Sequence, residues 1–150
     1  DLAVELAIAR ANSGDGSGAA ADLHALSTRT GCDRAALGEI AERIDEAGLD
    51  EHVWAVAEIA DTCADGLPSD GLLRAGGAAA RRGADADAES YFARAVARAP
   101  DPHEARVSIA ALWLDAGEYH RAIAAATAAP TIGAGCGATV LFLTASRNAS

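Results

Sequence analysis

The chain contains no lysine, methionine or glutamine, and aromatic residues make up only 4% of its 150 residues. Arginine therefore supplies all 12 basic side chains, against 22 acidic ones, and the formal net charge is −10. Because affinity for nucleic acid depends on neutralising phosphates with basic side chains, this composition excludes a typical nucleic-acid-binding protein.

Long apolar runs are also missing. The longest, residues 138–145, is much shorter than the roughly 18 residues that a membrane-spanning helix needs. No segment combines a charged start with an apolar stretch as a signal peptide does. We therefore expect no membrane association and a cytoplasmic location. The missing initiator methionine and the apolar residues near both ends further suggest a fragment of a longer protein.

Cysteine and histidine are scarce, and their spacing fits no known kind of site. Cys32, Cys63 and Cys136 lie 31 and 73 residues apart, without the close pairs of a zinc site or the density of a disulfide framework. We interpret Cys63 as a small core residue and the other two as residues near turns. No histidine has a second histidine three or four residues away. We expect no metal, no cofactor and no catalytic residue, and hence no enzyme activity.

Alanine dominates what is present, with 41 residues, whereas Leu, Ile, Val and Phe together number 28. So small a share of large apolar residues is typical of disordered chains. Alanine, however, has the highest helix propensity and lets neighbouring helices approach closely. The composition therefore favours an all-α fold with a thin core.

Four glycines define a repeat, with spacings of 34, 35 and 34 residues. They are Gly14, Gly48, Gly83 and Gly117. Seven residues before them stand the small residues Ala7, Ala41, Gly76 and Ala110, and eight residues before them the apolar residues Leu6, Ile40, Ala75 and Ile109. Agreement of several positions at one period indicates a repeat protein.

Each unit has the pattern of two helices. In the last full unit Asp101 can cap the first helix, Pro102 suits its first turn, and Glu104 completes a capping box. Gly117 then ends this helix, and a second helix follows over residues 118–129.

The other units have related start signals. Asp33 and Ser69 are expected to cap the first helices of the second and third units. The glycine-rich segment 12–18 predicts a long turn within the first unit. The chain then reads as one domain, with units at about 1–32, 33–68, 69–101 and 102–136 and a half-unit at 137–150.

Segment 105–129 resembles the tetratricopeptide repeat (TPR) in Ile109, Ala110, Trp113, Gly117-Glu118-Tyr119, Ala122-Ile123 and Ala129. The preceding unit matches at Gly76, Gly83, Ala88, Phe92, Ala95 and Pro100. The resemblance implies degenerate repeats in a right-handed superhelical solenoid of antiparallel helix hairpins, with about 4.5 units. In this family the first helix of each unit lines a concave groove that binds a peptide or protein.

Carried over to this chain, that geometry suggests the groove residues Arg74, Arg81, Glu42, Asp45, Asp70, Gly77, Glu104 and Asp115. Arg74 and Arg81 could anchor an acidic peptide or a chain terminus, because guanidinium groups bind carboxylates in a bidentate manner. Alternatively, they could pair with Glu42 and Asp45 on the neighbouring helix. The acidic segment 39–46 could likewise attract a basic partner or simply be a solvated helix face.

These features predict a non-catalytic scaffold for protein–protein interaction, whose partner the sequence does not identify. One alternative is a ligand- or peptide-sensing segment of a larger bacterial transcriptional regulator. A second is an arm that recruits substrates to an enzyme. The apolar ends are a candidate surface for self-association.

Overall fold

The computed structural model describes residues 2–128, and this part of the chain forms eight α-helices without a strand. The helices are α1 (Leu2–Asn12), α2 (Gly16–Thr30), α3 (Arg34–Glu46), α4 (Asp50–Asp61), α5 (Ser69–Arg81), α6 (Asp85–Arg98), α7 (Pro102–Asp115) and α8 (Tyr119–Ala128). The predicted all-α class is confirmed for these residues. The predicted half-unit 137–150 and Cys136 lie outside them.

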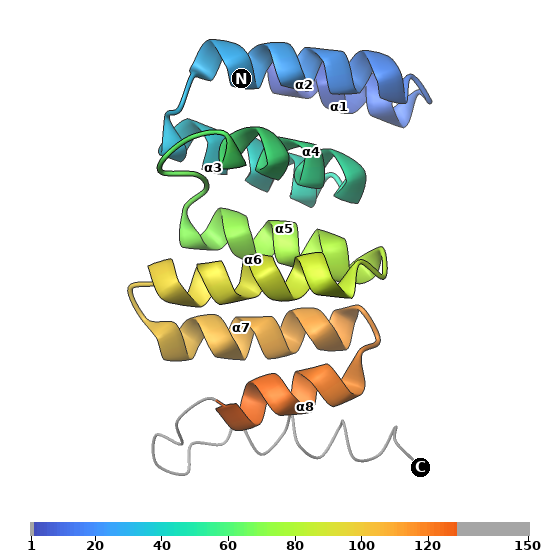
Figure 1. The fold of residues 1–150 in the computed structure, drawn as a ribbon. Helices are drawn as coiled ribbons and strands as arrows, with labels where there is room; N and C mark the ends of the chain where they lie inside the picture. The colour runs from blue at the N-terminus through green and yellow to red at the C-terminus, as the bar shows by residue number, and fades with distance from the viewer. Residues whose placement is uncertain (1, 129–150) are drawn as a thin grey trace.

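Consecutive helices pair into four hairpins, here called hairpin 1 (α1 and α2), hairpin 2 (α3 and α4), hairpin 3 (α5 and α6) and hairpin 4 (α7 and α8). Each hairpin packs against the next along the chain, so the four follow one another from the blue N-terminal end to the orange α8 (Figure 1). Helices that contact each other are therefore close in sequence.

The four glycines of the repeat lie at the turn inside each hairpin. Gly14, Gly48, Gly83 and Gly117 all have positive φ, between 72° and 88°, a conformation that residues with a Cβ rarely adopt. In hairpin 4 the Glu118 amide donates to the Trp113 carbonyl at 2.8 Å, as expected of a glycine-terminated helix. The period in the sequence is thus the period of these turns.

The predicted aspartate caps are confirmed. The side chain of Asp33 accepts hydrogen bonds from the amides of Ala35 and Ala36 at the start of α3. Asp101 does the same for His103 and Glu104 at the start of α7. Both caps satisfy amides that have no partner within the helix.

The predicted cap at Ser69 and the predicted long turn at segment 12–18 are wrong. Pro68, not Ser69, precedes α5, and the Ser69 hydroxyl donates to the Ala95 carbonyl of α6 at 2.9 Å. Segment 12–18 is not a long turn, because α2 already begins at Gly16. There Asp15 accepts a hydrogen bond from the Gly18 amide and caps the helix.

The buried core consists of two clusters. The first extends through hairpins 1 to 3 and is mainly aliphatic, with Leu37, Ile44 and Leu72 fully buried. The second lies in hairpins 3 and 4, where Phe92 and Trp113 meet edge to face with ring centres 5.3 Å apart. Trp113 is buried in this cluster.

A disulfide bond joins Cys32, just after α2, to Cys63, just after α4. The interpretation of Cys63 as only a small core residue, in a chain without the cysteine pattern of disulfides, is therefore wrong. Their separation of 31 residues is close to one repeat, so stacking brings the ends of the two helices together, with a Cα–Cα distance of 5.5 Å. The bond joins the connection before α3 to the segment after α4, and so closes a loop around hairpin 2 at its contact with α2.

None of the helices within residues 2–128 is both long enough and apolar enough to cross a membrane.

Candidate functional site

Arg74 and Arg81 lie on α5, seven residues apart and hence on one face of the helix. Arg74 donates through Nη1 to Asp45 at 2.9 Å and through Nη2 to Glu42 at 2.8 Å. Both carboxylates belong to α3, the first helix of the preceding hairpin. Of the two interpretations of Arg74, the structure shows the ion pairs with the neighbouring helix.

Arg81 binds carboxylates from three other helices. It donates through Nε and Nη2 to Asp50 on α4, with the shortest distance at 2.7 Å, and through Nη2 to Asp45 on α3 at 2.9 Å. Its Nη1 lies 3.6 Å from Asp115 on α7. These contacts connect hairpins 2, 3 and 4.

The pKa of Arg81 is raised above its ordinary value. The main cause is the hydrogen bonding that Arg81 donates to Asp50; partial burial acts in the opposite direction, and the negative charges of Asp50 and Asp45 raise the pKa further. The surrounding carboxylates thus favour the charged form of Arg81.

We call Arg74, Arg81, Glu42, Asp45, Asp50 and Asp115 the arginine–carboxylate cluster. Its two guanidinium groups meet four carboxylates, so the formal charge of the cluster is negative by two. Glu42 and Asp115 are exposed at its edge, whereas Asp45 and Asp50 are half-buried between the helices. The exposed glutamates Glu39 and Glu46 on α3 add further negative charge nearby.

Asp50 is the member of the cluster that sequence reasoning missed. It lies two residues after the turn glycine Gly48, and Arg81 lies two residues before the equivalent Gly83. Stacking of one hairpin on the next therefore brings the start of α4 close to the end of α5. The positions of Asp50 and Arg81 relative to their turn glycines are visible in the sequence. They predict a contact only when the stacking of the hairpins is known.

Three predicted groove residues lie outside the cluster. Asp70 and Glu104 line a separate hollow of about 290 Å³ between hairpins 3 and 4, together with Ser69, Pro100 and Ser108. Gly77 lies beside the cluster, where a Cβ would come within 2.9 Å of Leu112 Cδ2 and 3.4 Å of Arg81 Nη1. Its missing side chain thus makes room for side chains of the protein itself.

A second row of arginines links the second helices of successive hairpins. Arg94 on α6 pairs with Asp61 on α4, and this hydrogen bond is the main reason why the pKa of Arg94 is raised. Arg121 on α8 pairs with Glu89 and Asp85 on α6 and lies 5.1 Å from the Trp113 ring centre. Most arginines within residues 2–128 are thus occupied by the fold.

No protein-family model, no curated protein and no solved structure matches the chain. Within residues 2–128 no group of His, Cys, Asp and Glu side chains is arranged to hold a metal ion. The function must therefore be interpreted from the geometry and charge of the surface.

Proposed function

We propose that the chain is a right-handed superhelical solenoid of degenerate TPR-like hairpins that acts as a non-catalytic scaffold for protein–protein interaction. The regular stacking of the four hairpins and the recurring glycine turns support this proposal. So does the packing of Phe92 against Trp113, since the resemblance to the family rests in part on these two aromatic residues. In a solenoid, the extended surface made by successive first helices is the natural binding surface.

The partner that fits this surface best is a basic peptide or a basic segment of a protein. The observation that carries this choice is the charge of the arginine–carboxylate cluster, where four carboxylates surround two arginines. A carboxylate of an acidic ligand would have to displace a carboxylate of the protein from Arg74 or Arg81. A basic ligand adds to the cluster without breaking these pairs.

The exposed members of the cluster are the groups that a partner can reach. Glu42 uses one oxygen for Arg74 and is otherwise exposed, and Asp115 is held only loosely, 3.6 Å from Arg81. Lysine or arginine side chains of a partner can donate to these oxygens. The half-buried Asp45 and Asp50 keep Arg74 and Arg81 in place, and thereby hold the surface in shape.

A titration with oligolysine, followed by calorimetry at low and at physiological salt, tests this proposal. We expect binding that weakens with salt, and a severalfold loss in both Glu42→Gln and Asp115→Asn. The matched control is Glu58→Gln on α4, an exposed glutamate outside the cluster, which should bind as the unmodified chain does. Tighter binding of oligoglutamate, or an equal loss in the control, would contradict a basic partner.

The alternatives are a ligand- or peptide-sensing segment of a larger bacterial transcriptional regulator and an arm that recruits substrates to an enzyme.

The disulfide bears on the location of the protein. Structural disulfides persist in oxidising compartments and are rare in the cytosol. The Cys32–Cys63 bond therefore weighs against the cytoplasmic location expected from the sequence, and we infer an oxidising compartment. Alkylating free thiols in intact cells before lysis tests this inference, because Cys32 and Cys63 should escape alkylation unless a reductant is added first. Alkylation of both without reductant would support the cytoplasm.

A further inference from the structure

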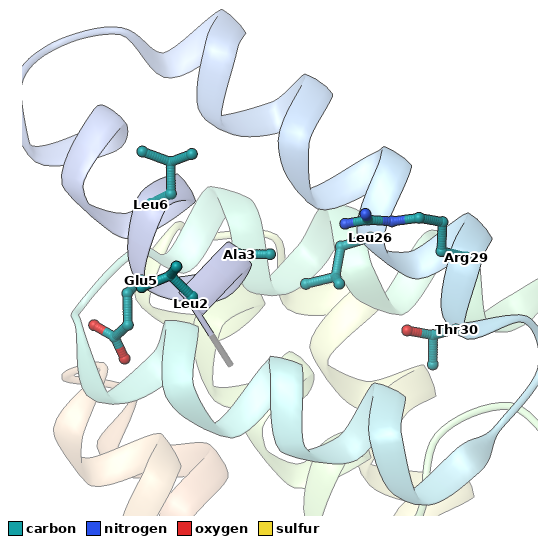
Figure 2. A pocket seen from close by; sticks show the side chains of 7 residues that line it. All are labelled: Leu2, Ala3, Glu5, Leu6, Leu26, Arg29 and Thr30. Carbon is teal, nitrogen blue, oxygen red and sulfur yellow. The ribbon is translucent and has the colours of Figure 1, made fainter.

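The surface of residues 2–128 has a large apolar hollow and a smaller acidic one. The large hollow, of about 850 Å³, lies between α1 and the end of α2, and Leu2, Leu6 and Leu26 line much of it (Figure 2). Nothing in the structure shows what covers these leucines, so this hollow identifies no ligand. The smaller hollow, of about 290 Å³, lies where α5 and α7 begin, and its lining indicates the chemistry of a ligand. We call it the α5–α7 hollow.

The lining of the α5–α7 hollow combines carboxylates with apolar side chains. Asp70, Asp101 and Glu104 line it, and no arginine or histidine is among the described residues that do so. Leu73 and Pro100 supply apolar walls. A lysine or arginine side chain has the same two parts, an apolar stem and a cationic head. Because the volume lies at the lower end of the range for small-molecule sites, the hollow suits one such side chain better than a larger ligand.

The carboxylates of the α5–α7 hollow are not neutralised by the protein's own arginines. Asp70 and Glu104 are exposed, and within residues 2–128 the structure shows no hydrogen bond or ion pair for either side chain. Asp101 accepts the amides of His103 and Glu104 at one and the same oxygen, Oδ1. In the arginine–carboxylate cluster, by contrast, each carboxylate already meets an arginine. A cation from a partner would therefore find its least neutralised carboxylates in the hollow.

The hollow and the arginine–carboxylate cluster lie at opposite ends of one surface. On α5, Asp70 of the hollow precedes Arg81 of the cluster by eleven residues. On α7, Glu104 precedes Asp115 by the same number of residues. Eleven residues are about three helical turns, so the two members of each pair share a face and lie about 16 Å apart along the axis. Because α5 and α7 pack against each other, the two helices present these faces together.

We propose that the α5–α7 hollow is a second subsite for the basic partner, which takes one lysine or arginine side chain there while the arginine–carboxylate cluster takes another. This inference rests on the proposed function, since it concerns the same partner. An extended chain spans about 3.3 to 3.6 Å per residue, so about five residues bridge the two subsites. The partner is thus an extended segment with basic side chains about five residues apart, and not any lysine-rich chain.

Two peptides of the same composition test this spacing. Each carries two pairs of lysines and about four glycines, which separate the pairs in one peptide and follow the adjacent pairs in the other. In a calorimetric titration at low salt, we expect the unmodified chain to bind the separated peptide severalfold tighter. The double variant Asp70→Asn/Glu104→Gln should remove that preference, because it leaves one subsite. Asp101 is kept, since it caps α7.

A matched control separates the subsite from a general effect of charge. Glu58→Gln/Asp87→Asn removes the same charge from exposed positions on the second helices α4 and α6, and it should keep the preference. Circular dichroism establishes that each variant is folded. Equal binding of the two peptides, or a preference that survives Asp70→Asn/Glu104→Gln, would overturn the second subsite. In either case weaker binding by Glu42→Gln would still support the proposed function, whereas binding that no variant changes would contradict both.

Discussion

Hairpins 1 and 2 and hairpins 3 and 4 are built from similar helices but are held together in different ways. In the second pair, aromatic side chains fill the space that the alanines leave, with Phe92 against Trp113 and the Gly76 backbone close beside the Phe92 ring. In the first pair no aromatic side chain is buried, since Trp54 is only partly covered and lies beneath Arg82. There the Cys32–Cys63 bond closes a loop around hairpin 2 at its contact with α2.

The interactions between hairpins 1 and 2 and those between hairpins 3 and 4 therefore differ in strength. Exposed or half-exposed ion pairs, such as those of Arg121 with Glu89 and Asp85, contribute about 0–1 kcal/mol each. A disulfide that closes a loop of this length contributes roughly 3–4 kcal/mol in the chain-entropy view. An alanine-rich repeat can thus be held either by a few large side chains or by one covalent bond.

Removal of the disulfide should have the largest effect. We expect Cys63→Ser to lower the free energy of unfolding by roughly 3–4 kcal/mol, because the unfolded chain loses a cross-link between residues 31 apart. Urea denaturation of Cys63→Ser measures the effect, with Cys136→Ser as a control that leaves the bond intact. Equal stability of Cys63→Ser and the control would mean that the bond does not stabilise the first pair of hairpins.

A methyl group at Gly76 should disturb the other pair. Its Cβ would lie 2.4 Å from Cε1 of the buried Phe92 ring, so the ring or the helix has to move. We expect Gly76→Ala to cost about 1–3 kcal/mol, the usual range for overpacking. Gly16→Ala is the matched control, because nothing lies within 4 Å of its Cβ and α2 begins there. If Gly76→Ala were as stable as Gly16→Ala, close packing would not be what holds hairpin 3.

Ionisation of Tyr91 at high pH should lower the stability of the fold, by less than the two substitutions above. Burial, and next the negative charge of Asp61, raise the pKa of this phenol from 10.0 to about 12. Because the pKa is raised in the folded state, the protonated Tyr91 phenol contributes its full share to the free energy of unfolding below pH 10. This share is lost as the pH rises from 10 to 12. In Tyr119→Phe, phenolate absorbance should therefore titrate with a midpoint near 12 while the chain is folded. A midpoint at 10 would show that Tyr91 is exposed.

Local signals in the sequence predicted the helix ends well. The turn glycines and the caps at Asp33 and Asp101 act within a few residues, so their effect does not depend on the rest of the fold. Ser69 failed as a cap for the opposite reason, because its hydroxyl found the Ala95 carbonyl, 26 residues away, on another helix.

The candidate site could be predicted only in part. The pairing of Arg74 with Glu42 and Asp45 was one of two alternatives, since all three residues were expected on neighbouring helices. The contact of Arg81 with Asp50 and the disulfide both depend on how far one hairpin is displaced against the next. That displacement follows from side-chain packing across the junction, which the period alone does not specify.

Amide hydrogen exchange, measured helix by helix with and without a reductant, is the most direct test of the difference between the two pairs of hairpins. Reduction of the Cys32–Cys63 bond should speed exchange in α1 to α4, the helices of the pair that contains the bond, and leave α5 to α8 as protected as before. Equal acceleration in all eight helices of residues 2–128, or none in α1 to α4, would contradict the view that one covalent bond replaces aromatic packing in the first pair of hairpins.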